Sequence, residues 1–290
     1  MKLFDPHIHM TSRPTSNYQA MADAGISAIV EPSFWLGQPR THVGTFEDYF
    51  LSLLGWERFR ASQFGISHFC TLSINPKEAN SPSIAQGVLD LLPRYLEKDG
   101  VVAVGEIGFD DQTDAEEHLF AEPLKLAMEF ELPVLIHTPH RDKKRGTARS
   151  LELVRRVGFP EQRVLIDHNN EETLPMVLET NCWAGHSIYP DTKMDELRMV
   201  ALIQTYGSDR IIINSAADWG VSDPFKVPKT VEAMYEAGLD EKTIQTVVWD
   251  NPVAFFGQSE RLDLDRDPID QSQLWEGNYV LRGQEPVVES

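Results

Sequence analysis

The sequence predicts a single (β/α)8 barrel, and three observations support this fold class. Short apolar runs rich in β-branched residues alternate with longer amphipathic stretches, eight runs in all. The alternation covers about 255 of the 290 residues, a length typical of one such barrel. Most of the later runs end in His, Glu or Asp. The predicted strands are Leu3–Ile8, Ile26–Glu31, Ile66–Ile74, Val101–Ile107, Val134–His137, Val164–Asp167, Cys182–His186 and Ile211–Asn214.

The segments between the predicted strands have the length and period of helices. Glu116–Glu131 carries an apolar stripe with charged residues opposite, formed by Leu119, Phe120, Leu124, Ala127 and Met128. Two segments end in a glycine, at Ala24–Gly25 and Val157–Gly158, as helices often do. The alternative fold is a doubly wound open sheet, in which a glycine-rich turn often follows the first strand. Here that strand leads to His7 and His9 instead, which favours the barrel.

Two regions depart from the simple repeat. Residues 1–257 are predicted to form the barrel and residues 258–290 an acidic C-terminal tail, whose Leu, Trp, Tyr and Val residues suggest packing on the barrel. An aromatic-rich insertion separates the second and third strands, from Pro32 to Phe64. We expect it to add core and helix packing, and the alternatives are a lid or a contact in a homo-oligomer. Its aromatic residues are Phe34, Trp35, Phe46, Tyr49, Phe50, Trp56 and Phe59.

Composition excludes several classes of protein. Lys and Arg number 26 against 45 Asp and Glu, a formal net charge of −19, which argues against a broad nucleic-acid or anionic-membrane surface. No apolar run approaches the length of a membrane span, and the N-terminus lacks the zones of a signal peptide. Cys70 and Cys182 are the two cysteines, so a disulfide framework is excluded and a cytoplasmic location is expected.

Histidines and carboxylates gather at the predicted strand ends. His7 and His9 lie two residues apart, so both imidazoles face one side of a regular strand. The carboxyl ends of all strands meet at one face of a barrel, where such enzymes place their sites. The other residues of this set are Glu106, His137, His168 and Asp218. Four imidazoles and two carboxylates exceed the roughly four ligands of a single tetrahedral ion.

This set suits two divalent cations that share one carboxylate. Imidazole ligands favour Zn²⁺, and the carboxylates leave Mn²⁺ and Mg²⁺ open. A water molecule bridging two such ions has a strongly lowered pKa and becomes hydroxide at neutral pH. Asp218 is predicted to accept its proton and return it to the leaving group. Asp5 and Asp167 would orient ligand histidines, or else cap strand ends.

Substrate contacts are predicted next to these ligands. His140, Arg141 and Lys144 belong to a cationic cluster, completed by Lys143, Arg145 and Arg149, that would receive a phosphate or carboxylate. The alternative is a solvated helix start with surface salt bridges. His186 and Trp219 would line the same mouth, or be packed in the core.

Four features of the sequence together resemble a known family. They are the Asp-x-His-x-His opening at Asp5–His9, GEIGFD at Gly105–Asp110, the segment Glu117–His137 and the position of Asp218. They resemble TatD-type metal-dependent hydrolases, (β/α)8 barrels of the amidohydrolase superfamily, over the chain as far as Gly257. The resemblance implies that His7, His9 and Asp218 hold the more buried ion, that Glu106 bridges both, and that His137 and His168 hold the second.

Two stretches differ from the nuclease-type members of that family. HTPHRDKKRG stands where those members usually have His-x-Arg, and NSAAD replaces the common Glu-Thr-Asp. The function predicted first is therefore hydrolysis of a small, anionic or neutral ester, lactone, amide or phosphoester. The alternatives are a metal-dependent deoxyribonuclease of TatD type and a non-catalytic barrel that serves in binding or pathway assembly.

Overall fold

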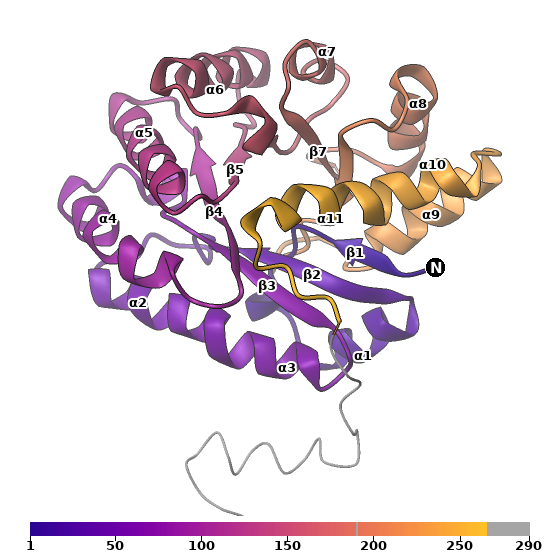
Figure 1. Cartoon of the computed structure of the whole chain (residues 1–290), viewed down its shortest axis with the longest axis horizontal. Helices are drawn as coiled ribbons and strands as arrows, with labels where there is room; N and C mark the ends of the chain where they lie inside the picture. Colours follow the sequence, from indigo (N-terminus) through magenta and orange to yellow (C-terminus); the bar gives the residue numbers. More distant parts are fainter. Residues whose placement is uncertain (190, 266–290) are drawn as a thin grey trace, which may run out of the picture.

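The computed structural model describes residues 1–189 and 191–265. Eight parallel strands follow one another in chain order around a barrel, and each pairs with the next (Figure 1). This arrangement confirms the predicted (β/α)8 fold. The strands are β1 (Leu3–Asp5), β2 (Ile26–Pro32), β3 (Ser67–Leu72), β4 (Val101–Gly108), β5 (Val134–His137), β6 (Val164–Ile166), β7 (Trp183–Ser187) and β8 (Ile211–Asn214).

Helices surround the strands on the outside of the barrel (Figure 1). The predicted helix at 116–131 is present two residues earlier, with Thr113 as its N-cap and three acidic residues in its first turn. The helices are α1 (Ser16–Asp23), α2 (Val43–Leu51), α3 (Arg58–Ser62), α4 (Pro82–Leu96), α5 (Asp114–Glu129), α6 (Lys143–Val157), α7 (Leu174–Leu178), α8 (Glu196–Tyr206), α9 (Lys226–Glu236), α10 (Glu241–Gln245) and α11 (Asn251–Phe256).

Backbone hydrogen bonds join the chain after β8 to the chain after β1. The His9 amide donates to the Ala217 carbonyl and the Ala216 amide to the His7 carbonyl, both at 2.8 Å. These bonds lie just beyond the last residues of the two strands. They therefore fix the segments that carry His7, His9 and Asp218 against each other at the mouth of the barrel.

The core has two parts, because alternate residues of each strand face the helices or the barrel interior. The larger part lies between strands and helices. The smaller part fills the interior at the end of the barrel opposite the mouth, where Phe4 lies 6.2 Å from Phe256 of α11, ring centre to ring centre. Figure 1 shows α11 crossing that end of the barrel. The polar site is thus confined to the other end.

The first strand is shorter than predicted. It ends at Asp5 rather than Ile8, because Pro6 has no amide hydrogen to continue the ladder. His7 and His9 therefore lie in the loop after β1, and their convergence comes from that loop rather than from regular strand geometry. His168 likewise follows β6 and takes a left-handed conformation, with φ of +62°.

The aromatic-rich insertion divides into two parts. Residues 43–62 form the helical layer next to β2 and β3, in which Phe46 and Phe50 are fully buried. Residues 33–42 form a loop at the mouth of the barrel. Within the tail predicted to begin at 258, Leu262 and Leu264 pack on the interior cluster, and residues 266–290 lie outside the described part. No helix among the described residues is long and apolar enough to cross a membrane.

Candidate metal centre

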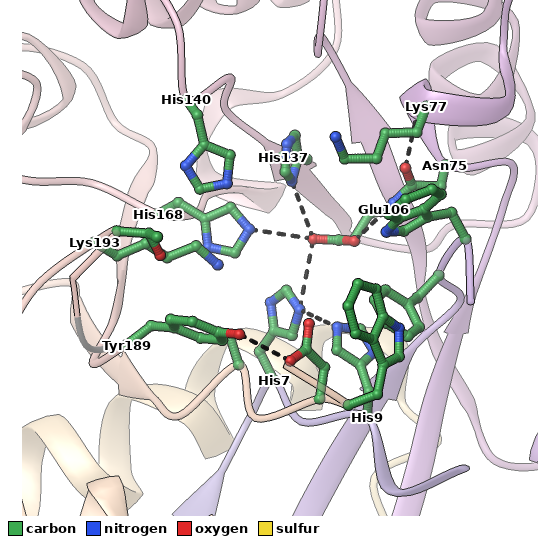
Figure 2. Close-up of a pocket in the computed structure, with 16 residues that line it drawn as sticks. His7, His9, Asn75, Lys77, Glu106, His137, His140, His168, Tyr189 and Lys193 are labelled. Carbon is green, nitrogen blue, oxygen red and sulfur yellow. Dashed lines mark hydrogen bonds and ion pairs between the residues drawn. The ribbon is translucent and has the colours of Figure 1, made fainter. Parts of the chain in front are cut away.

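A cavity of about 520 Å³ opens at the carboxyl ends of the strands, where the sequence predicted the site (Figure 2). All six residues predicted as metal ligands line it. The lining consists of His7, His9, Phe34, Trp35, Asn75, Lys77, Glu106, His137, His140, His168, Tyr189, Thr192, Lys193, Ala216, Asp218 and Trp219. The predicted set is therefore brought to one place, although its members do not all contact one another.

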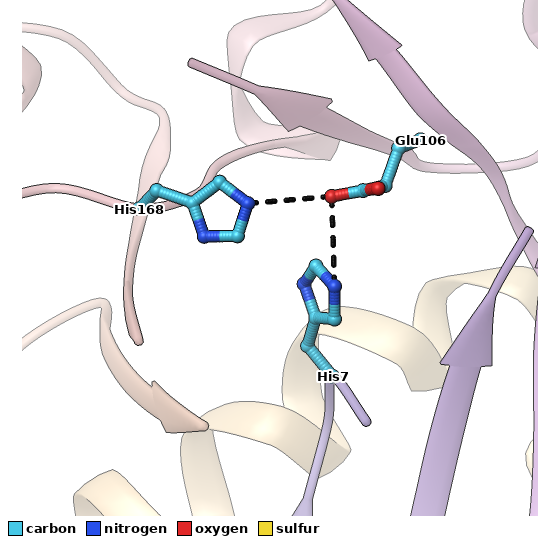
Figure 3. A group of neighbouring side chains, drawn as sticks. All are labelled: His7, Glu106 and His168. Carbon is cyan, nitrogen blue, oxygen red and sulfur yellow. Dashed lines mark ion pairs between the residues drawn. The ribbon is translucent and has the colours of Figure 1, made fainter. Parts of the chain in front are cut away.

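Glu106 of β4 is the centre of the arrangement. Its Oε1 atom lies 3.3 Å from His168 Nε2, 3.4 Å from His137 Nδ1 and 3.5 Å from His7 Nε2. Figure 3 shows the carboxylate facing the His7 and His168 rings from a different strand. The ligand atoms of His7, Glu106 and His168 lie within 4.8 Å of one another, and all three side chains are buried. Such convergence of imidazoles on one carboxylate is typical of a metal site.

Neighbouring polar groups fix the orientation of these ligands. His7 Nδ1 lies 2.6 Å from Asp167 Oδ2, and His168 Nδ1 lies 2.7 Å from the Ser187 hydroxyl. The contact of Nδ1 of His7 with Asp167 directs the Nε2 atom of the ring to Glu106. The Asn75 amide donates to Glu106 Oε2 at 2.9 Å, which leaves Oε1 to face the histidines.

The electrostatics of the cluster favour an ionised Glu106. Burial raises the pKa of this carboxyl, but the His7 charge and the hydrogen bonds of His137 and His168 outweigh burial and hold the pKa well below its ordinary value. Burial lowers the pKa of His168 well below its ordinary value, and the nearby Lys193 charge acts in the same direction. A buried anion surrounded by imidazoles is the combination that a divalent cation stabilises.

His9 and His137 complete the donor set. His9 Nε2 lies 3.1 Å from His7 Nε2, and burial lowers the pKa of the His9 imidazole well below its ordinary value. His9 Nδ1 and His137 Nε2 are buried and have no hydrogen-bond partner within residues 1–189 and 191–265. Buried imidazole nitrogens are normally satisfied. Unpaired nitrogens beside an ionised carboxylate therefore fit divalent metal ions, which accept such lone pairs.

Asp218 lies at the edge of this cluster, in the loop after β8. Its Oδ1 accepts hydrogen bonds from the Tyr189 hydroxyl at 3.0 Å and from the Gly220 amide at 2.8 Å. These two donors fix the carboxylate at the wall of the cavity. Asp218 is close enough to the metal cluster to share a substrate with it, but it is not among the three residues whose ligand atoms converge.

The predicted substrate contacts have different positions. His140 and Trp219 line the cavity, and both residues are exposed at its mouth. Arg141 is 87% exposed and pairs with Asp111, and Lys144 is exposed; neither lines the cavity. His186 is fully buried and also lies outside the cavity lining. Its neighbours in β7 explain this, since Ser187 faces His168 and successive strand residues point to opposite sides.

Several lining residues were not predicted from the sequence. Tyr189 and Lys193 belong to the loop after β7, and Asn75 and Lys77 to the loop after β3. The sequence indicates these four residues only through their positions after predicted strands. Phe34 stacks on His9, with ring centres 3.8 Å apart and planes inclined by 13°, and Trp35 packs edge-on against Trp219. The aromatic-rich insertion thus contributes a wall of the site.

The sequence of this chain is similar to those of known proteins. The model of a family described as TatD related DNase matches residues 4–257. The chain belongs to this family. An uncharacterized metal-dependent hydrolase of Methanocaldococcus jannaschii is 26% identical over 257 residues, which are 88% of this chain and 99% of the relative. The recognition made from the sequence is confirmed, and the predicted class of enzyme, a metal-dependent hydrolase, is that of the family. Family membership does not support the alternative of a non-catalytic barrel.

Solved structures agree with this assignment. A TatD-like protein from Archaeoglobus fulgidus is 29% identical, with a TM-score of 0.74 over 87% of this chain and 99% of that one. A phosphotriesterase homology protein from Escherichia coli, complexed with phosphate in its active site, is 13% identical with a TM-score of 0.62 over 88% of this chain and 98% of that one. The second likeness shows a shared fold.

Proposed function

We propose that this TatD-family chain hydrolyses a small ester, lactone, amide or phosphoester with two divalent metal ions, Zn²⁺ before Mn²⁺ or Mg²⁺. The observation that carries the proposal is the contact of Glu106 Oε1 with three imidazole nitrogens at 3.3–3.5 Å. Glu106 would bridge the ions, with His7, His9 and Asp218 on one side and His137 and His168 on the other. Bound divalent ions supply positive charge that acidifies water and polarises the bond to be cut.

The side chains around the cluster support specific roles. Asp218 accepts the proton of the attacking water and returns it to the leaving group, while Tyr189 and Gly220 hold its Oδ1 atom in place. Asp167 orients His7, and Ser187 orients His168. Phe34 and Trp219 lie at the mouth of the cavity and reduce the access of bulk water.

A deoxyribonuclease is the second candidate, because the matching family is described by that activity. A nuclease needs cations along the path of the phosphate backbone. The chain has a net charge of −19, and most arginines near the mouth are paired with carboxylates: Arg141 with Asp111, Arg145 with Asp142 and Arg149 with Glu117. This charge distribution favours a small substrate.

The variant Glu106→Gln tests the proposal. The amide is nearly isosteric but carries no charge, so it cannot bridge two cations. We expect bound metal, measured by mass spectrometry after dialysis, to fall from about two ions per chain to one or fewer, and hydrolysis of a panel of lactones and phosphoesters to be abolished. Glu129→Gln, an exposed change on α5, is the matched control. Two ions per chain with full turnover in Glu106→Gln would contradict the assignment.

A further inference from the structure

Lys193 is a cation of the cavity lining that has no carboxylate partner among the described residues. Several cationic side chains near the mouth have a carboxylate partner: Arg141, Arg145 and Arg149 as described above, and Lys77, which lies 3.0 Å from Asp110. Lys143 donates to the Thr138 hydroxyl and the His168 carbonyl, both at 2.9 Å. Lys193, in the loop after β7, has no ion pair with any carboxylate in residues 1–189 and 191–265. Its Nζ atom lies 5.1 Å from the centre of the Tyr189 ring.

Lys193 is directed to the metal cluster rather than to solvent. Figure 2 shows it beside His168 at the wall of the cavity that it lines. Burial lowers the pKa of the Lys193 ammonium, and the charges of Asp167, Glu106 and Asp218 oppose this effect. Those three carboxylates belong to the site itself. The Lys193 ammonium therefore interacts electrostatically with the carboxylates of the site itself.

A half-buried cation without a partner is costly unless a ligand supplies the missing charge. When divalent ions are bound to Glu106 and its histidines, the site carries an excess of positive charge, because the same few carboxylates must balance the ions and Lys193. An anionic group that enters the cavity would give Lys193 the partner it lacks and would offset the excess positive charge. Lys193 lies beside His168 in the cavity lining, so a group bound to it would lie next to the cluster of Glu106 and the histidines.

We propose that Lys193 is the anion-binding residue of the site and that the substrate is a small phosphate monoester. This inference rests on the proposed hydrolytic function. The group under attack in a carboxylic ester, lactone or amide is uncharged before the reaction. A phosphoryl group already carries charged oxygens on the atom under attack, and one of them would face Lys193. Water adds its oxygen to phosphorus, the bond from phosphorus to the alcohol oxygen breaks, and a proton passes to that oxygen, which gives an alcohol and inorganic phosphate.

The same observations limit the length of the substrate. A nucleic acid requires further cations for the neighbouring phosphates. Lys77, the other lysine in the cavity lining, is already paired with Asp110. A single charged group at Lys193, with an apolar leaving group against Phe34 or Trp35, fits the lining better.

Inorganic phosphate is the direct probe. We expect its Kd for the metal-loaded protein, measured by calorimetry, to rise at least about tenfold in Lys193→Gln, roughly 1.4 kcal/mol. Lys193→Arg should restore much of the affinity. Lys98→Gln is the matched control, because Lys98 is exposed just before β4 and so lies at the opposite end of the barrel. Metal content and circular dichroism verify that each variant is folded and loaded.

Kinetics separate the two proposals. In Lys193→Gln the KM for para-nitrophenyl phosphate should rise about tenfold or more, and the KM for the neutral para-nitrophenyl acetate should stay nearly constant. If no ester is hydrolysed but phosphate binding depends on Lys193, the hydrolytic proposal fails and the anion site stands. An unchanged phosphate Kd in Lys193→Gln, or a KM that rises equally for both esters, overturns the inference.

Discussion

At the scale of single residues, Asp218 is the proposed base, and its carboxylate is held in place through one oxygen. Tyr189 and Gly220 both donate to Oδ1. Within the described residues, both hydrogen bonds to its side chain reach this one oxygen, and Oδ2 accepts none. A base fixed by one oxygen loses little orientational freedom when it accepts a proton with the other. Chemistry and positioning are thereby divided between two atoms of one side chain.

Asp218→Asn should separate catalysis from metal binding. The amide oxygen keeps both hydrogen bonds, but the side chain no longer accepts a proton, so kcat should fall at least about a hundredfold. The ion held by His137 and His168 should remain, as metal analysis of the variant would show. Tyr189→Phe, which removes only one hydrogen bond to the carboxylate, should lower kcat far less. A kcat for Asp218→Asn within a factor of two of the wild type would exclude its role as the base.

The sequence brought the candidate ligands to the cavity more readily than the candidate substrate contacts, for a physical reason. The carboxyl ends of parallel strands meet at one face, so Glu106 and His137 could be placed together from their strand positions alone. The pattern of charged residues along the sequence does not show where their side chains lie in the fold. Arg141 and Lys144 looked cationic along the sequence, but the fold exposes both, whereas the isolated Lys193 enters the cavity. Which lysine enters the cavity depends on tertiary contacts that no local pattern records.

At the scale of elements, the loop between β2 and α2 links the barrel to its site. Arg40 Nη1 lies 2.5 Å from Glu78 Oε2, and Arg40 Nη2 donates to the Phe34 carbonyl at 2.9 Å. Phe34 in turn stacks on His9. The sequence predicted extra packing in this insertion, with a lid as an alternative. Its helices provide the packing, and Phe34 and Trp35 form part of the cavity wall, a division that aromatic content alone does not reveal.

Arg40→Met should destabilise the protein by about 3 kcal/mol, since it leaves the buried Glu78 carboxylate without its partner. Methionine keeps apolar contact with the Phe46 and Tyr49 rings below the guanidinium, so the lost charge dominates. Urea denaturation gives the free energy of unfolding. Adding Glu78→Gln should recover part of the loss. Arg94→Met, at an exposed pair with Glu47, is the control and should cost less than about 1 kcal/mol. Equal losses in the two single variants would contradict the structural role of Arg40.

At the scale of the whole molecule, the fold separates stability from chemistry. Phe255 and Phe256 of α11 close one end of the barrel together with apolar strand residues. The polar ligands occupy the other end. The barrel could be predicted from alternation and length because both are properties of the entire chain. The termination of β1 at Asp5 depends on one proline and on bonds to the segment after β8, which lies some two hundred residues away.

The net charge of −19 leads to the last prediction, which concerns DNA. Non-specific DNA binding requires several cations, and typical dissociation constants are about 10⁻⁴ to 10⁻⁶ M. With Lys77, Arg141, Arg145 and Arg149 already paired with carboxylates, fluorescence anisotropy of labelled DNA should show no binding tighter than about 10⁻⁴ M at about 100 mM salt. A nuclease would instead bind in the micromolar range, and log K would fall linearly with log salt, by about 0.9 for each phosphate neutralised. A slope of several units would require a cationic track, and would contradict the small substrate. Because Lys193 is a single charge, its replacement could reduce such a slope by only about one unit, so the two substrate classes remain distinguishable in the variant as well.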